Sequence, residues 1–189
     1  MRRALARTST LLVALCAAGA AQAAQPVPPS IIAPQPVKAS WADAQIRAVT
    51  AAALLGADPT TFRPNEPLTR GELADALAAW GKPSAMPADP THVVTMRELD
   101  AQLVGALGLL PAAKRIRVAA RDAGLEPTSM LGTETVARLL GLRLNHPQGA
   151  DDLELLPAQP ATRAEAAYSL AKAVALHSFW VTSDVPAHT

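Results

Sequence analysis

The sequence is organised around residues 62–74, which read Phe-Arg-Pro-Asn-Glu-Pro-Leu-Thr-Arg-Gly-Glu-Leu-Ala. Two prolines favour an extended first half, and the second half has the composition of a helix start. Thr69 and Glu72 have the spacing of a capping box, in which each side chain binds the backbone N–H of the other residue. Arg70 falls at the first helical position, where the helix dipole disfavours a cation. We therefore interpret Thr69 and Glu72 as capping residues and Arg70 as a candidate anion-binding residue.

The same pattern recurs without gaps at residues 155–167, which read Leu-Leu-Pro-Ala-Gln-Pro-Ala-Thr-Arg-Ala-Glu-Ala-Ala. This copy has Thr162 and Glu165 at the capping positions and Arg163 at the position of the first arginine. A cation that is repeated where the helix dipole disfavours it indicates a contact with an anion rather than chance. Arg163 is therefore a second candidate anion-binding residue.

A weaker copy lies between the two, at residues 90–99, where Thr95 and Glu98 again have the capping spacing. Met96 stands at the arginine position of this copy, so it predicts no third arginine site. Internal repetition at such spacing predicts a repeat architecture whose units are too small to bury a hydrophobic face alone.

The first 39 residues are expected to lie outside the fold. Residues 1–23 have a basic start, a short apolar run and a small-residue cleavage site, as in a secretory signal peptide. Its removal would take away the single cysteine and leave acidic residues in slight excess, which excludes a disulfide scaffold and the basic excess of nucleic-acid binders. Residues 24–39 hold five prolines and read as a linker.

The remaining chain predicts an all-α fold of six helices joined by long loops. Apolar residues recur at helical spacing, no stretch reads as a strand, and the last three helices are expected at about residues 112–123, 133–144 and from Thr162 onward. The expected layout is a first repeat at 40–81, a degenerate repeat at 82–124, a third repeat at 125–176 and a tail at 177–189 that resembles the start of a further repeat.

The first repeat resembles the S-layer homology family. That family has Trp-Ala near the start of a first helix, an isoleucine shortly after it, a loop that ends in Phe-x-Pro, and Thr-Arg-Ala-Glu at the start of a second helix. This chain has the matching residues in the same order: Trp41-Ala42, Ile46, Phe62-Arg63-Pro64 and Leu68-Thr69-Arg70-Gly71-Glu72. The second full copy matches from Pro157 to Glu165 but lacks the aromatic residue.

The resemblance implies a bundle of helix–loop–helix units, commonly three in a pseudo-threefold arrangement, with grooves that bind anionic cell-wall sugars. It implies that Arg70 and Arg163 meet the acid group of the sugar and that Trp41 forms a groove wall. From its residue type alone, Trp41 is more often a core or interface anchor than a platform for a sugar. The implied partner is an anionic secondary cell-wall polymer or a peptidoglycan-linked glycan.

The leading hypothesis is a secreted, non-catalytic protein that anchors to the cell wall or cell surface through these motifs. The histidines and acids fit no catalytic or metal-binding spacing, so no enzyme activity, metal or cofactor is expected. No partner nucleic acid and no membrane span after signal cleavage are expected either. Two alternatives remain open: the targeting region of a cell-wall hydrolase whose catalytic domain lies beyond residue 189, or a helical module that binds another envelope protein. A basic run at residues 114–121 reads as a solvated face or as a contact for anionic polymers.

Overall fold

The computed structural model describes residues 40–143 and 155–182, which belong to one unit, Lys38–Thr189. The predicted signal peptide (residues 1–23), the linker (residues 24–39) and the end of the predicted tail lie outside the described residues.

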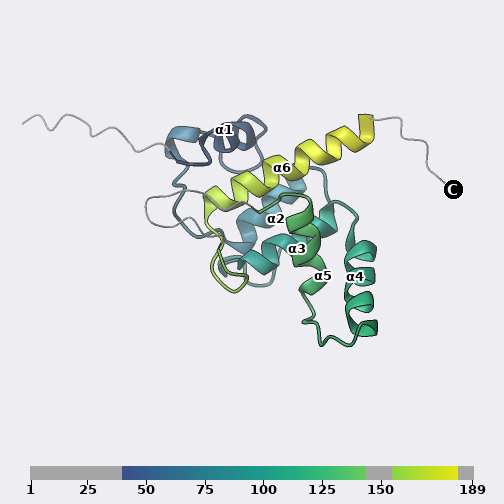
Figure 1. Cartoon of the computed structure of the whole chain (residues 1–189). Helices are drawn as coiled ribbons and strands as arrows, with labels where there is room; N and C mark the ends of the chain where they lie inside the picture. Colours follow the sequence, from purple (N-terminus) through teal and green to yellow (C-terminus); the bar gives the residue numbers. More distant parts are fainter. Residues whose placement is uncertain (1–39, 144–154, 183–189) are drawn as a thin grey trace, which may run out of the picture. The chain divides into compact units, whose positions relative to one another are not determined.

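The described residues form helices and no β-sheet, which confirms the all-α prediction (Figure 1). None of these helices combines the length and the apolar character needed to cross a bilayer. In chain order the elements are α1 (Asp43–Ala51), the short 3-10 helix η1 (Pro59–Thr61), α2 (Arg70–Ala79), α3 (Met96–Ala106), α4 (Leu110–Asp122), α5 (Leu131–Leu139) and α6 (Arg163–Thr182).

Helix α5 ends earlier than the sequence predicts. The apolar periodicity predicts a helix to about residue 144, but the helix ends at Leu139. Gly141 then takes a positive φ of 66°, a left-handed conformation that commonly ends helices and that glycine adopts without steric cost. The prediction of this boundary was therefore wrong because the glycine signal outweighs the apolar periodicity.

The segments that precede α2, α3 and α6 meet in a closed ring of backbone hydrogen bonds. The N–H of Leu68 donates to the carbonyl of Ala161 (2.8 Å), the N–H of Ala161 to that of Val94 (2.8 Å), and the N–H of Val94 to that of Leu68 (2.9 Å). All three residues are fully buried. The three copies of the motif thus pair in a cycle, in which each copy donates to one neighbour and accepts from the other.

The same cycle satisfies the first N–H groups of the three helices, which have no partner inside a helix. The first N–H of α2, from Arg70, donates to His92 at 2.9 Å; that of α3, from Met96, donates to Gln159 at 3.0 Å; that of α6, from Arg163, donates to Glu66 at 2.8 Å. Each helix start therefore rests on the loop that precedes another of the three helices.

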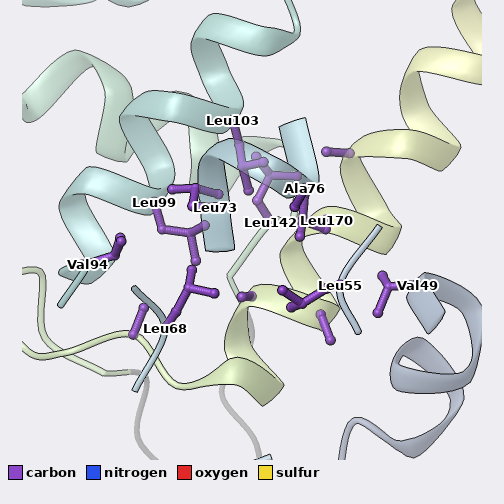
Figure 2. Packing of buried hydrophobic residues seen from close by; sticks show 14 of the residues in the cluster. Val49, Leu55, Leu68, Leu73, Ala76, Val94, Leu99, Leu103, Leu142 and Leu170 are labelled. Atoms are coloured by element: carbon purple, nitrogen blue, oxygen red, sulfur yellow. The ribbon is translucent and has the colours of Figure 1, made fainter. Parts of the chain in front are cut away.

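The hydrophobic core surrounds this ring. Figure 2 shows Leu68 and Val94 from the ring beside leucines of α2 and α3, with Leu142 and Leu170 closing the other side. Of the three helices that follow the ring (α2, α3 and α6), two have another helix packed against them: α1 packs against α6, and α5 packs against α3. Among the described residues no helix packs against α2 in this way. The middle copy of the motif lacks a first helix, so the corresponding surface of α2 is left to the connector that follows it.

A buried ion pair ties α3 to the chain after α5. The Nε of Arg143 lies 3.0 Å from the Oδ2 of Asp100, and both side chains are almost completely buried. Burial raises the pKa of Asp100 to about 7, against the opposing effects of the positive charges of Arg143 and Arg138, and Glu134 raises the pKa slightly further. This carboxyl group therefore titrates near neutral pH.

The stability of the protein should depend on pH through Asp100. Because its folded-state pKa lies above the unfolded value of 3.8, the folded state binds the proton more tightly, and the resulting stabilisation is lost as the pH rises through about 7. We expect the free energy of unfolding to fall by about 1–2 kcal/mol between pH 5.5 and 8. Urea titrations at several pH values measure this, and Asp100→Asn should flatten the profile.

The matched control is Asp75→Asn, because Asp75 is an exposed carboxylate on α2. Its pH profile should follow that of the wild-type protein. If Asp100→Asn and the wild-type protein have the same pH dependence, Asp100 does not titrate in this range.

Candidate functional site

Arg70 pairs with the capping glutamate of the neighbouring helix. Its Nη2 donates to the Oε1 of Glu98, the third residue of α3. The Oε2 of Glu98 accepts from the backbone N–H of Thr95 at 2.9 Å. Burial alone would raise the pKa of Glu98, but the hydrogen bonds from Thr95 and Arg70 outweigh it and hold the pKa below its usual value. The Glu98 carboxylate is therefore ionised and offsets part of the charge of Arg70.

Arg70 and Glu98 lie at a cleft of about 310 Å³ between α2, α3 and the connector after α2. The walls are mainly apolar, and the polar groups come from few positions; the lining residues are Arg70, Leu73, Ala74, Leu77, Ser84, Ala85, Pro87, Val94, Glu98 and Gln102. The side chain of Arg70 is 39% exposed. A guanidinium has five N–H donors, so the pair with Glu98 leaves donors of Arg70 available at the cleft.

Arg163 makes the equivalent pair but in a buried setting. Its Nη1 donates to the Oε1 of Glu72, its Nε donates to the carbonyl of Phe62 at 2.8 Å, and its guanidinium carbon lies 4.8 Å from the centre of the Phe62 ring. The side chain is only 7% exposed. Arg163 thus holds the loop before α2 against the start of α6, and the structure leaves it little contact with solvent.

The third equivalent position is occupied by Met96, which is fully buried. Arg70 pairs with the capping glutamate of α3, and Arg163 pairs with that of α2. By the same order, an arginine at the position of Met96 would pair with Glu165, the capping glutamate of α6. The three copies therefore have different environments at one position: a half-exposed arginine at a cleft, a buried arginine and a buried methionine.

The capping residues have the geometry of the motif. Thr69 Oγ1 accepts from the N–H of Glu72, and the Glu72 side chain accepts from the N–H of Thr69 at 2.9 Å. In the second full copy, the N–H of Glu165 donates to Thr162 Oγ1 at 3.2 Å. Glu72 thus accepts from its own helix cap and from an arginine of another helix. The sequence pattern assigned only the first of these roles.

Trp41 is half-buried before α1 and contacts Tyr168 of α6, with ring centres 5.8 Å apart and the planes tilted by 45°. It is not among the residues that line the cleft at Arg70. The structure therefore places Trp41 at the contact between α1 and α6, away from the arginine that borders the cleft.

Sequence reasoning missed the acidic partners of both arginines. Glu98 and Glu72 are separated from Arg70 and Arg163 by 28 and 91 residues respectively, so no local pattern reveals the pairs. The glutamate recurs in all three copies and the arginine in two, but the capping role already accounts for the glutamate, so the sequence held no separate signal for these pairs. The described residues contain no group of three or more His, Cys, Asp or Glu side chains arranged to hold a metal.

The comparisons with known proteins single out the first copy of the motif. Residues 35–74 match the model of the S-layer homology domain, a segment that includes α1, η1 and the first turn of α2 with Arg70 and Glu72. No curated protein and no solved structure matches the chain. Domains of this type bind cell-wall polymers and associate proteins with the cell surface.

Proposed function

We propose that the chain is an exported, non-catalytic protein that anchors to an anionic cell-wall glycopolymer, in keeping with the match of residues 35–74 to the model of the S-layer homology domain. The observation that carries the proposal is the cleft at Arg70. It combines an accessible guanidinium with apolar walls from Leu73 and Leu77, which suits a sugar ring that bears an acid group.

The three residues implied by the resemblance have unequal support. Arg70 lines a cleft and keeps free donors, so we assign it the contact with the acid group of the polymer. Arg163 and Trp41 are buried or half-buried in contacts within the fold. We propose that they act on binding indirectly, because Arg163 fixes the loop before α2 and Trp41 fixes α1.

Binding to the wall should depend on Arg70. We expect Arg70→Ala to weaken the affinity of the protein for purified cell-wall sacculi about tenfold to a hundredfold, because a charge-assisted hydrogen bond of roughly 1.5–3 kcal/mol is lost. Arg70→Lys should restore part of the affinity, since lysine keeps the charge but not the planar fork of donors. The measurement is the bound fraction over a range of protein concentrations at 0.15 M salt.

The matched control is Arg47→Ala, which removes another exposed, ion-paired arginine from the same domain, outside the cleft. It should bind like the wild-type protein. Equal binding of Arg70→Ala and the wild-type protein would remove Arg70 from the mechanism. Failure of the wild-type protein itself to sediment with sacculi would contradict the anchoring function.

A further inference from the structure

Helix α4 carries a concentration of positive charge that the proposed function does not use. Its sequence from Leu110 to Asp122 holds four cations, Lys114, Arg115, Arg117 and Arg121, against the single acid Asp122. None of these four cations forms an ion pair among the described residues. This differs from Arg70 and Arg163, each of which is offset by a glutamate.

Two of these cations line a second cleft, of about 260 Å³, between α4 and α5. Lys114 and Arg117 lie on one wall and the hydroxyl residues Ser129 and Thr133 on the other, and no acidic residue lines the cleft. The hairpin of α4 and α5 lies outside the segment that matches the S-layer homology domain. The cleft is therefore independent of the site at Arg70.

The guanidinium of Arg117 has unused hydrogen-bonding capacity in this cleft. Within residues 40–143 and 155–182, the buried Nε of Arg117 has no hydrogen-bond acceptor, and its Nη1 donates one long hydrogen bond, of 3.4 Å, to the carbonyl of Ser129. A buried donor without an acceptor costs free energy, so such groups usually have a bound partner. A ligand oxygen that enters the cleft would supply this acceptor after a small movement of the side chain.

The first turn of α5 borders the same cleft and is not capped by a side chain. Met130 at the N-cap position makes no side-chain hydrogen bond to the helix start, whereas α2 and α3 have complete capping boxes. Gly132 and Thr133 line the cleft at this first turn. Backbone N–H groups at a helix start, together with the positive end of the helix dipole, favour an oxyanion.

We propose that the cleft between α4 and α5 binds a phosphate group. A tetrahedral phosphate presents acceptor oxygens in several directions, so it can bind Lys114, Arg117 and the first turn of α5 at the same time. The phosphate belongs to a phosphorylated envelope polymer or to a lipid headgroup, two sources with the same chemistry. In either case the protein has a second contact with the cell envelope, besides the one proposed at Arg70.

The test is a titration of the full-length protein with inorganic phosphate at constant ionic strength, followed by the NMR shifts of the Gly132 and Thr133 amides. We expect Lys114→Ala to raise the dissociation constant about fivefold to tenfold. Arg115→Ala removes the same charge from a neighbouring position that does not line the cleft, and it should change the constant less than twofold. The same spectra show whether each variant is folded.

Two further titrations distinguish the sources. If a glycerol-phosphate oligomer shifts these amides, the source of the phosphate is a polymer. If vesicles that contain phosphatidylglycerol affect the same amides, the source is a lipid headgroup. Either result supports the site. Equal effects of Lys114→Ala and Arg115→Ala would show unspecific attraction to positive charge and would overturn the proposal. Absence of shifts at Gly132 and Thr133 with all three ligands would also overturn it. The Arg70 variant should retain phosphate binding at this cleft, so failure here and failure of the proposed anchoring are distinguishable.

Discussion

Replacement of Arg163 by alanine should destabilise the protein by about 3 kcal/mol. The variant loses the ion pair with Glu72, the hydrogen bond to the carbonyl of Phe62 and the contact with the Phe62 ring. Breaking a fully buried pair costs roughly 3–5 kcal/mol, and the low end applies here because Glu72 is 33% exposed and regains water. The measurement is the free energy of unfolding from chemical denaturation.

A double-mutant cycle with Glu72→Gln separates the ion pair from the other contacts of Arg163. We expect a coupling free energy of about 1 kcal/mol or more, because the two residues are in direct contact. Arg47→Ala serves as the control, since its exposed pair with Asp43 should contribute at most roughly 1 kcal/mol. A loss below about 1 kcal/mol for Arg163→Ala would contradict the structural role and would return Arg163 to the list of ligand contacts.

Gly132→Ala should also cost about 3 kcal/mol, because α5 crosses α4 at very close range. A Cβ at Gly132 would lie 2.0 Å from the backbone carbonyl oxygen of Ala113, and a backbone atom yields only if the two helices move apart. The higher helix propensity of alanine, roughly 1 kcal/mol over glycine, is too small to compensate. Thermal and urea unfolding of the variant measure the loss.

Gly71→Ala is the matched control, since Gly71 also lies in the first turn of a helix. A Cβ there would lie 3.1 Å from Pro90, a tight contact that small shifts relieve. The equivalent position of α6 is already an alanine, Ala164, whose N–H makes the same type of hydrogen bond to the neighbouring loop. We expect a change within about 1 kcal/mol. If Gly132→Ala is as stable as this control, the close crossing of α4 and α5 is not a constraint on the fold.

Local signals predicted the starts of α2 and α3, and the structure explains why they were sufficient there, whereas α4 and α5 begin about two residues earlier than predicted. Thr69 and Thr95 precede α2 and α3 directly, because a capping box satisfies the N–H groups that no helix can satisfy itself. The end of α5 was predicted too late because apolar residues continue past Leu139, and only the conformation of Gly141 ends the helix.

The candidate site was predictable only in part. The sequence singled out Arg70 and Arg163 as equivalent, and their local motifs are indeed the same. Their difference in exposure, 39% against 7%, arises from residues far away in the chain: the cleft at Arg70 exists where α2 lacks a partner helix, whereas Phe62 and Glu72 cover Arg163. Such differences between repeats depend on tertiary packing, which a single sequence does not reveal.

The cycle of hydrogen bonds between Leu68, Val94 and Ala161 also sets the order of assembly during synthesis. A chain that emerges from its N-terminus has Leu68 and Val94 long before Ala161, so two sides of the cycle stay open until the start of α6 arrives. The loop-closure entropy of this late segment has to be overcome before its contacts stabilise anything, which slows folding. The nascent protein therefore cannot close this cycle until the segment that precedes α6 has been synthesised.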